Sequence, residues 1–249
     1  MGLNGALRVT VLGCDGSYPG PAGACSGYLV RGAGMTIWLD AGSGTLANLQ
    51  RHLGLDEIDA IVLSHEHPDH WSDIEGYRVA AAYVMERTGV PVYAPAGVRA
   101  RVFSDFEPAV EWHPVTDGDE VHLGDHHGGV RLRFSRTDHP PETLAVRVDA
   151  GGRSLAYSAD TGPGWSLSAL GGGIDLALCE ATWLADHEGT GGGHLSARQA
   201  GAMARAADVG RLVITHVWPT VDPTTSKAEA AAAYGGPVDV ARLHDEYEV

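Results

Sequence analysis

The chain has 249 residues, 44% of them hydrophobic, so it is long enough to bury a substantial core. Its formal net charge is −15, from 17 basic and 32 acidic residues, which argues against a long nucleic acid as the partner. No linker rich in Pro, Gly or Ser divides the chain, and we expect a single domain over residues 1–249. An apolar stretch of membrane-spanning length and a signal peptide are both missing, which predicts a cytoplasmic protein without a membrane partner.

Short β-rich runs alternate with helical stretches along the chain. Strands are expected at 8–12, 27–31, 36–39, 60–63, 91–94, 130–135, 145–148, 154–158, 176–179 and 212–215. Helices are expected at about 45–53, 71–88, 97–104, 196–208 and 225–234. Ser196 and Gln199 fit a capping box, and Asp149 to Gly152 fits a hairpin turn. Many strands with few helices between them predict a mixed α+β/α/β fold of two sheets with helices outside.

The segment from Ser64 to His70 reads Ser-His-Glu-His-Pro-Asp-His and directly follows the expected strand at 60–63. His65 and His67 are two residues apart, so on extended backbone they point to the same side. Asp69 and His70 follow where the chain turns into a helical stretch. One strand end can therefore offer two histidines to one metal ion and an Asp-His pair to a second. These ligand types suit zinc, with manganese or iron as alternatives.

Five more residues of ligand or catalytic type follow expected strands: Asp40, His139, Asp160, Glu180 and His216. Because ligands in α/β folds gather at the carboxyl ends of strands, these positions could meet at one edge. A two-metal site needs a bridging anion, and Asp160 is the best candidate because one carboxylate can reach both ions. Asp40 would accept a ring N–H from a ligand histidine. The expected metal ligands are His65, His67 and His139 for one ion and Asp69, His70 and His216 for the other, with Asp160 shared.

This ligand pattern resembles the metallo-β-lactamase superfamily over nearly the whole chain. The resemblance implies a four-layer αβ/βα sandwich that binds two divalent metal ions, with a hydroxide between them as nucleophile. His67 places the chain with the hydrolases, since diiron relatives that reduce oxygen or nitric oxide carry Glu there. No cysteine ligand lies near Asp160, which argues against a true β-lactamase of the B1 type.

A second pair of motifs resembles ribonuclease Z-like phosphodiesterases. These are Cys179-Glu180-Ala181-Thr182-Trp183 and Gly193-His194-Leu195-Ser196-Ala197. The resemblance implies that His194 is the general acid for the leaving group and that Glu180 orients it, with Asp69 counted among the catalytic residues. His194 precedes an expected helix N-terminus, where a carboxylate partner would offset the dipole that disfavours imidazolium.

The sequence departs from ribonuclease Z between His139 and Asp160. Bacterial members insert a long tRNA-gripping arm there, whereas a short hairpin is expected here. The shorter relatives include actinobacterial cyclic-nucleotide phosphodiesterases, which the runs at 11–17, 155–162 and 178–181 resemble most. The expected function is therefore hydrolysis of small phosphodiesters such as 3′,5′-cyclic nucleotides.

Other functions stay open at this point. A ribonuclease Z-like RNA 3′-end nuclease would need a partner to grip the RNA, and a lactone, thioester or sulfate-ester hydrolase would need no Glu180–His194 pair. A non-enzymatic scaffold is disfavoured by the intact ligand set. The resemblance also implies a homodimer.

Some features near the motifs have no assigned role. Trp183 and Trp218 could stack on a base, although core packing is the expectation for both. His187 lies close to the His194 motif, and the glycine-rich loop at 13–27 could overhang the site as a lid. His126 and His127 are expected in an exposed turn.

Overall fold

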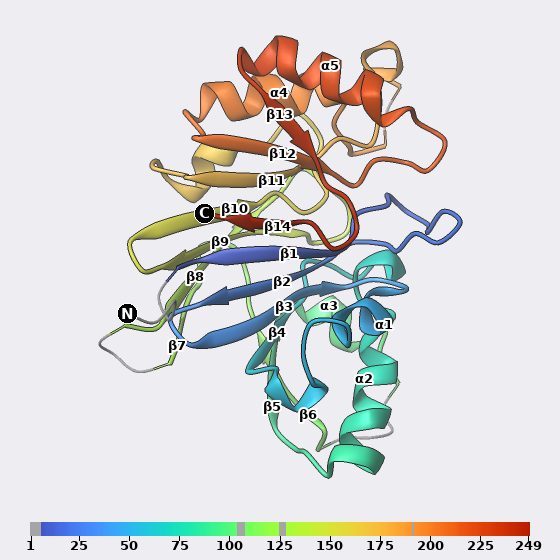
Figure 1. Ribbon diagram of the computed structural model, residues 1–249, viewed down its shortest axis with the longest axis vertical. Helices are drawn as coiled ribbons and strands as arrows, with labels where there is room; N and C mark the ends of the chain where they lie inside the picture. The colour runs from blue at the N-terminus through green and yellow to red at the C-terminus, as the bar shows by residue number, and fades with distance from the viewer. Residues whose placement is uncertain (1–5, 104–107, 125–127, 191) are drawn as a thin grey trace.

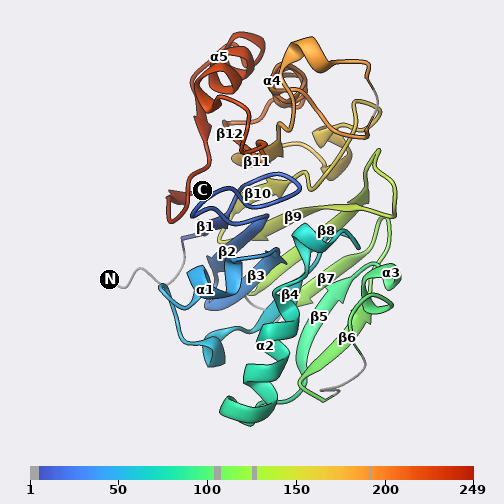
Figure 2. The same cartoon turned by 90° about the vertical axis from the view of Figure 1, so that its right-hand side faces the viewer.

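The computed structural model describes residues 6–103, 108–124, 128–190 and 192–249, so the expected turn at His126 and His127 lies outside the described residues. Two seven-stranded mixed sheets pack face to face, with helices on their outer faces (Figures 1 and 2). The first sheet has the order β14 (Glu246–Glu248), β1 (Arg8–Gly13), β2 (Gly27–Gly32), β3 (Met35–Ala41), β4 (Ala60–Val62), β5 (Val90–Ala94) and β6 (Val110–Pro114). The second has the order β13 (Val238–Val240), β12 (Arg211–Thr215), β11 (Leu176–Glu180), β10 (Arg153–Tyr157), β9 (Leu144–Ala150), β8 (Val130–Arg136) and β7 (Glu120–Leu123).

Each sheet carries its helices on one face. The helices are α1 (Thr45–Leu49), α2 (Ile74–Ala80) and α3 (Ala96–Arg99) on the first sheet, and α4 (Ala197–Ala206) and α5 (Pro223–Tyr234) on the second. The alternation of side chains along β3 separates two cores, because Ile37 and Leu39 enter the core between the sheets while Trp38 enters the core under the helices. This arrangement confirms the four-layer sandwich that the sequence predicts.

All ten expected strands are present, as are the hairpin turn between β9 and β10 and the capping box of α4. Four strands are not predicted from the sequence: β6, β7, β13 and β14. They have three to five residues each, and β14 pairs with β1 from the far end of the chain, so local pattern carries little signal. The expected helix at 71–88 is wrong in detail: a 3-10 turn at Pro68–His70 precedes α2, and a π-turn at Ala81–Met85 follows it.

The parallel strands of both sheets end at one common edge of the sandwich. Strands β3 to β6 run parallel in the first sheet, as do β10 to β13 in the second. The residues that follow β4, β10 and β12 come together there. None of the helices in the described ranges is long and apolar enough to cross a bilayer.

Candidate metal centre

Unusual backbone conformations mark three strand ends at this edge. Asp40, Ala159 and His216 have φ values of 57°, 50° and 55°, in the left-handed region that non-glycine residues rarely adopt. Each such residue costs about 1–3 kcal/mol and persists only where its surroundings hold it in place. Strain of this kind concentrates at functional sites, and here it lies beside every cluster described below.

The first cluster joins His65, His67, His139 and Asp160, whose ligand atoms lie within 4.8 Å of one another. Nδ1 of His67 lies 3.0 Å from Nε2 of His65 and 3.1 Å from Nε2 of His139. Oδ2 of Asp160 is 3.6 Å from Nε2 of His65 and 3.9 Å from Nε2 of His139. Four donors therefore surround one small space.

The second cluster joins Asp69, His70, His216 and the same Asp160. Nε2 of His70 and Nε2 of His216 both lie 3.4 Å from Oδ2 of Asp69. They are 3.3 and 3.4 Å, respectively, from Oδ1 of Asp160. Asp160 thus turns one oxygen to each cluster, which is the arrangement a bridging carboxylate needs.

The donor spacing fits metal ions. Four ligands about 2.0–2.1 Å from a tetrahedral zinc ion lie about 3.3–3.4 Å from one another, close to the separations observed. Nε2 of His70 and Oδ1 of Asp160 are also buried without a hydrogen-bond partner. Buried polar atoms are rarely left unpaired, so both are accounted for by an ion between them. The residues present could hold two divalent cations.

A buried network around Asp40 orients one histidine of each cluster. Oδ2 of Asp40 lies 2.7 Å from Nδ1 of His70 and accepts a 2.8 Å hydrogen bond from the Ser64 hydroxyl. Because that hydroxyl donates to Asp40, its oxygen accepts from Nδ1 of His65, 3.0 Å away. Both rings are thereby fixed with Nε2 toward the clusters. Tyr157 donates a further 2.7 Å hydrogen bond to Asp40.

Two further ligand histidines, His139 and His216, are held in a similar way. Nδ1 of His139 lies 2.8 Å from the Gly193 carbonyl, which accepts its proton. Nδ1 of His216 lies 2.8 Å from Oγ1 of Thr182, and that hydroxyl donates in turn to Glu180 at 2.8 Å. Gly193 and Thr182 belong to the two motifs that suggested Glu180 and His194. The motifs alone did not show that these two residues would orient ligand histidines.

His194 and Glu180 form a pair beside the clusters. Nδ1 of His194 lies 3.0 Å from Oε1 of the fully buried Glu180, and its ring stacks on that of His216 with centroids 5.4 Å apart. Backbone N–H groups of Thr161 and Leu195 also donate to the Glu180 carboxylate. Since its oxygens are already engaged, Glu180 is suited to orient His194 and not to bind a metal. Ten predicted site residues therefore meet at one place.

Protonation states also differ across the site. Burial raises the pKa values of Asp69 and Asp160, but His70 and His216 outweigh it and hold both well below the usual range. Burial lowers the pKa of His65 well below its ordinary value, leaving the neutral form that binds metals. For His70, burial is outweighed by Asp160, Asp69 and Asp40, which raise its pKa well above normal. Metal binding would displace that proton.

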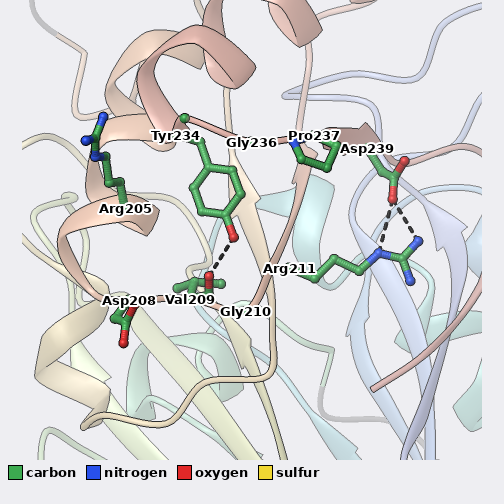
Figure 3. A pocket seen from close by; sticks show the side chains of 10 residues that line it. Arg205, Asp208, Val209, Gly210, Arg211, Tyr234, Gly236, Pro237 and Asp239 are labelled. Carbon is green, nitrogen blue, oxygen red and sulfur yellow. Dashed lines mark hydrogen bonds and ion pairs between the residues drawn. The ribbon is translucent and has the colours of Figure 1, made fainter.

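Not every cavity belongs to this edge. A cavity of about 520 Å³ lies at the opposite end of β12, where Arg211 begins the strand (Figure 3). Its wall includes Tyr234, whose hydroxyl donates to the Val209 carbonyl, and Arg211, which pairs with Asp239. The described residues there form no cluster of metal-ligating side chains. Volume alone therefore does not locate the chemistry of this protein.

Comparison with known proteins agrees with this geometry. Residues 35–217 match the family model described as a β-lactamase superfamily domain. The chain belongs to this superfamily. It is a metal-dependent hydrolase with the superfamily's sandwich fold.

Three similar proteins refine the placement within the superfamily. The Mycobacterium tuberculosis protein Rv1339 is 34% identical over 98% of this chain and 93% of its own length. The crystal structure of YhfI from Bacillus subtilis superposes with a TM-score of 0.88 at 26% identity, covering 98% of this chain and 100% of that one. Ribonuclease Z from Mycobacterium bovis is 27% identical over 94% of this chain and 95% of its own length. The similarity thus extends over essentially the whole chain.

Proposed function

We propose that this chain is a dinuclear metal-dependent phosphodiesterase that acts on small substrates such as 3′,5′-cyclic nucleotides. The observation that carries the proposal is the His194–Glu180 pair beside two clusters that share Asp160. An oxygen leaving group of a phosphodiester needs a proton, and a histidine beside the clusters can supply one. Lactones and thioesters have no comparable need for such a buried acid pair.

The residues of the chain divide this work between them. When bound, two divalent ions would supply Lewis-acid stabilisation of phosphate charge and lower the pKa of water, with zinc the expected metal. The seven residues of the two clusters would hold them. His194, with Nδ1 held by Glu180, has Nε2 left to donate a proton to the departing oxygen. Asp40 and Thr182 fix the rings of His70 and His216 before substrate arrives.

The short segment between His139 and Asp160 indicates a small substrate. Strands β9 and β10 form a tight hairpin in this interval, so no extended arm arises there to grip a nucleic acid. The net charge of −15 adds repulsion for a polyanion. Similarity to ribonuclease Z keeps RNA 3′-end cleavage as the second candidate. The short hairpin and the negative net charge favour a small diester over RNA.

We also propose that residues 1–249 act as one hydrolase domain. The core between the sheets supports this, since it draws residues from Leu7 to Tyr247 and so unites both ends of the chain. We expect activity in the cytoplasm from the sequence pattern, and a homodimeric state from the family resemblance.

The deciding experiment is incubation of the metal-loaded protein with 3′,5′-cyclic AMP and separation of the products by chromatography. We expect 5′-AMP from the wild type and none from His67→Ala, which removes a ligand of the first cluster. No product from the wild type would exclude cyclic AMP as substrate. Cleavage of a tRNA precursor instead would establish the second candidate.

A further inference from the structure

Four aromatic rings form a row along the mouth of the site. The row is Tyr18, Trp218, Trp183 and His187, with successive ring centroids 6.2, 4.3 and 5.6 Å apart. Trp183 also lies edge-on to the proposed acid His194, at 6.3 Å. Three loops contribute to this aromatic rim, so it is assembled by the tertiary fold.

The two ends of the rim are open to solvent, and none of its four rings belongs to the hydrophobic cores of the described residues. Tyr18 is 43% exposed and the side chain of His187 is 56% exposed, while Trp183 and Trp218 are half-buried. Core packing, which we expected for both tryptophans, is therefore wrong. Exposed aromatic surface is unfavourable in water, and a row of it beside a reactive centre is typical of a binding site.

The rim is also fixed in place. The backbone N–H of Trp183 donates to the Leu195 carbonyl, and its own carbonyl accepts from Ala197, so the residue is anchored between β11 and α4. Nε1 of Trp218 donates to the Ser17 hydroxyl. Rings held in this way lose little conformational entropy when a ligand stacks on them.

A cavity of about 400 Å³ continues from the rim past His194. Its described lining holds two carboxylates, Asp138 and Glu188, and neither lysine nor arginine. Arg198 pairs with Glu188 from outside the lining, while one oxygen of Asp138 accepts the Gly164 N–H. Because Arg198 offsets the charge of Glu188, the remaining charge is that of Asp138, and the wall beside it disfavours a second phosphate and favours an uncharged group that can donate hydrogen bonds.

We propose that the aromatic rim and this cavity bind the nucleoside part of the substrate, with the base stacked on the rim and hydroxyl or amino groups toward Asp138. This inference rests on the proposed phosphodiesterase function and narrows it to esters that carry an aromatic, uncharged nucleoside. Selectivity then comes from stacking, which tolerates different bases because every base has a π-face.

The test compares 5′-AMP with ribose 5-phosphate, which keeps the phosphate and sugar but lacks the base. Isothermal titration of the metal-loaded protein should show tighter binding of AMP. Trp183→Ala should weaken AMP by about 5- to 150-fold in Kd and leave ribose 5-phosphate within about twofold, whereas Trp183→Phe should retain most of the affinity. Metal content and thermal unfolding report whether each variant is intact.

Matched controls lie on β6, away from the rim. Trp112→Ala removes another half-buried indole and should leave AMP binding unchanged. His187→Ala, at an exposed position, should weaken AMP several-fold, whereas His113→Ala, which removes a ring stacked on Tyr93, should not.

Equal affinity of the wild type for AMP and ribose 5-phosphate would overturn the proposal, as would an equal loss of both ligands in Trp183→Ala. Hydrolysis of cyclic AMP by the wild type, measured in parallel, separates the two ideas. Turnover without base selectivity would reject nucleoside binding at the rim and leave the phosphodiesterase activity established. Base-selective binding through Trp183 without turnover of any phosphodiester would reject the phosphodiesterase activity and support binding at the rim.

Discussion

The two clusters that share Asp160 are similarly buried but differ in charge. The first adds three imidazoles to the shared carboxylate, and its His67 is half-buried. The second adds two imidazoles and a carboxylate of its own, Asp69, which is half-buried as well. At similar burial, the cluster with more negative charge should hold a divalent cation more tightly. Charge alone can thus make similar ligand sets unequal, and we expect the second ion to be held more firmly.

The largest effect on metal content and activity should come from removing Asp160, which both clusters share. Asp160→Ala takes an oxygen from both, so we expect elemental analysis to find fewer than two ions per chain and activity to fall to background. Asp186→Ala, which removes an exposed carboxylate nearby, should keep full occupancy. Normal two-metal occupancy in Asp160→Ala would refute the bridging role.

Loss of the proposed acid should separate chemistry from metal binding. His194→Ala should keep both ions and lower kcat by about 10²–10⁴-fold on a substrate with a poor leaving group. An activated 4-nitrophenyl ester, whose leaving group needs no proton, should be affected much less. Full activity toward cyclic AMP would remove His194 from the mechanism.

Two conservative variants should distinguish the clusters from each other. Thr182→Val removes the contact that orients His216, whereas Ser64→Ala removes a hydroxyl that orients His65 and also donates to Asp40, the partner of His70. Thr182→Val should weaken only the second site, by about 10- to 100-fold in chelator competition, and Ser64→Ala should weaken the first site as well. If Thr182→Val weakened the first site, or Ser64→Ala left it unchanged, the proposed division of ligands would be wrong.

The smallest expected change is a shift in pH dependence. Burial lowers the pKa of His194, but the charge and hydrogen bond of Glu180, with help from Asp160, outweigh it and raise the pKa to about 9. An acid catalyst is active below its pKa and loses activity as pH rises through it. Glu180→Gln removes the charge, so the alkaline limb of kcat should move to lower pH. An unmoved limb would assign it to another group.

Much of the site could be predicted because ligand chemistry and strand ends are both visible in sequence. The spacing of His65 and His67 after an apolar run, and the isolated Asp160 and His216 after later runs, were enough to predict one shared edge. The capping box at Ser196 similarly located α4. In each case the signal lies within a few neighbouring residues.

The other features of the site depend on contacts between residues that are far apart in the sequence. The hydrogen bond from Tyr157 to Asp40 joins residues 117 positions apart, and the aromatic rim joins rings from three loops. The left-handed conformations of Asp40 and His216 likewise exist only because the surrounding fold holds them. Strand β14 is found only by its pairing with β1. No local pattern encodes these features.

We expect Asp160 to lie between two metal ions. Anomalous diffraction from zinc-loaded crystals, measured at the zinc edge, tests it most directly. We expect two peaks roughly 3.5–4 Å apart, one facing each oxygen of Asp160, with the stronger peak beside Asp69 and His70 at limiting zinc. A single peak at full zinc loading, or two peaks with Asp160 bound to only one of them, would contradict it.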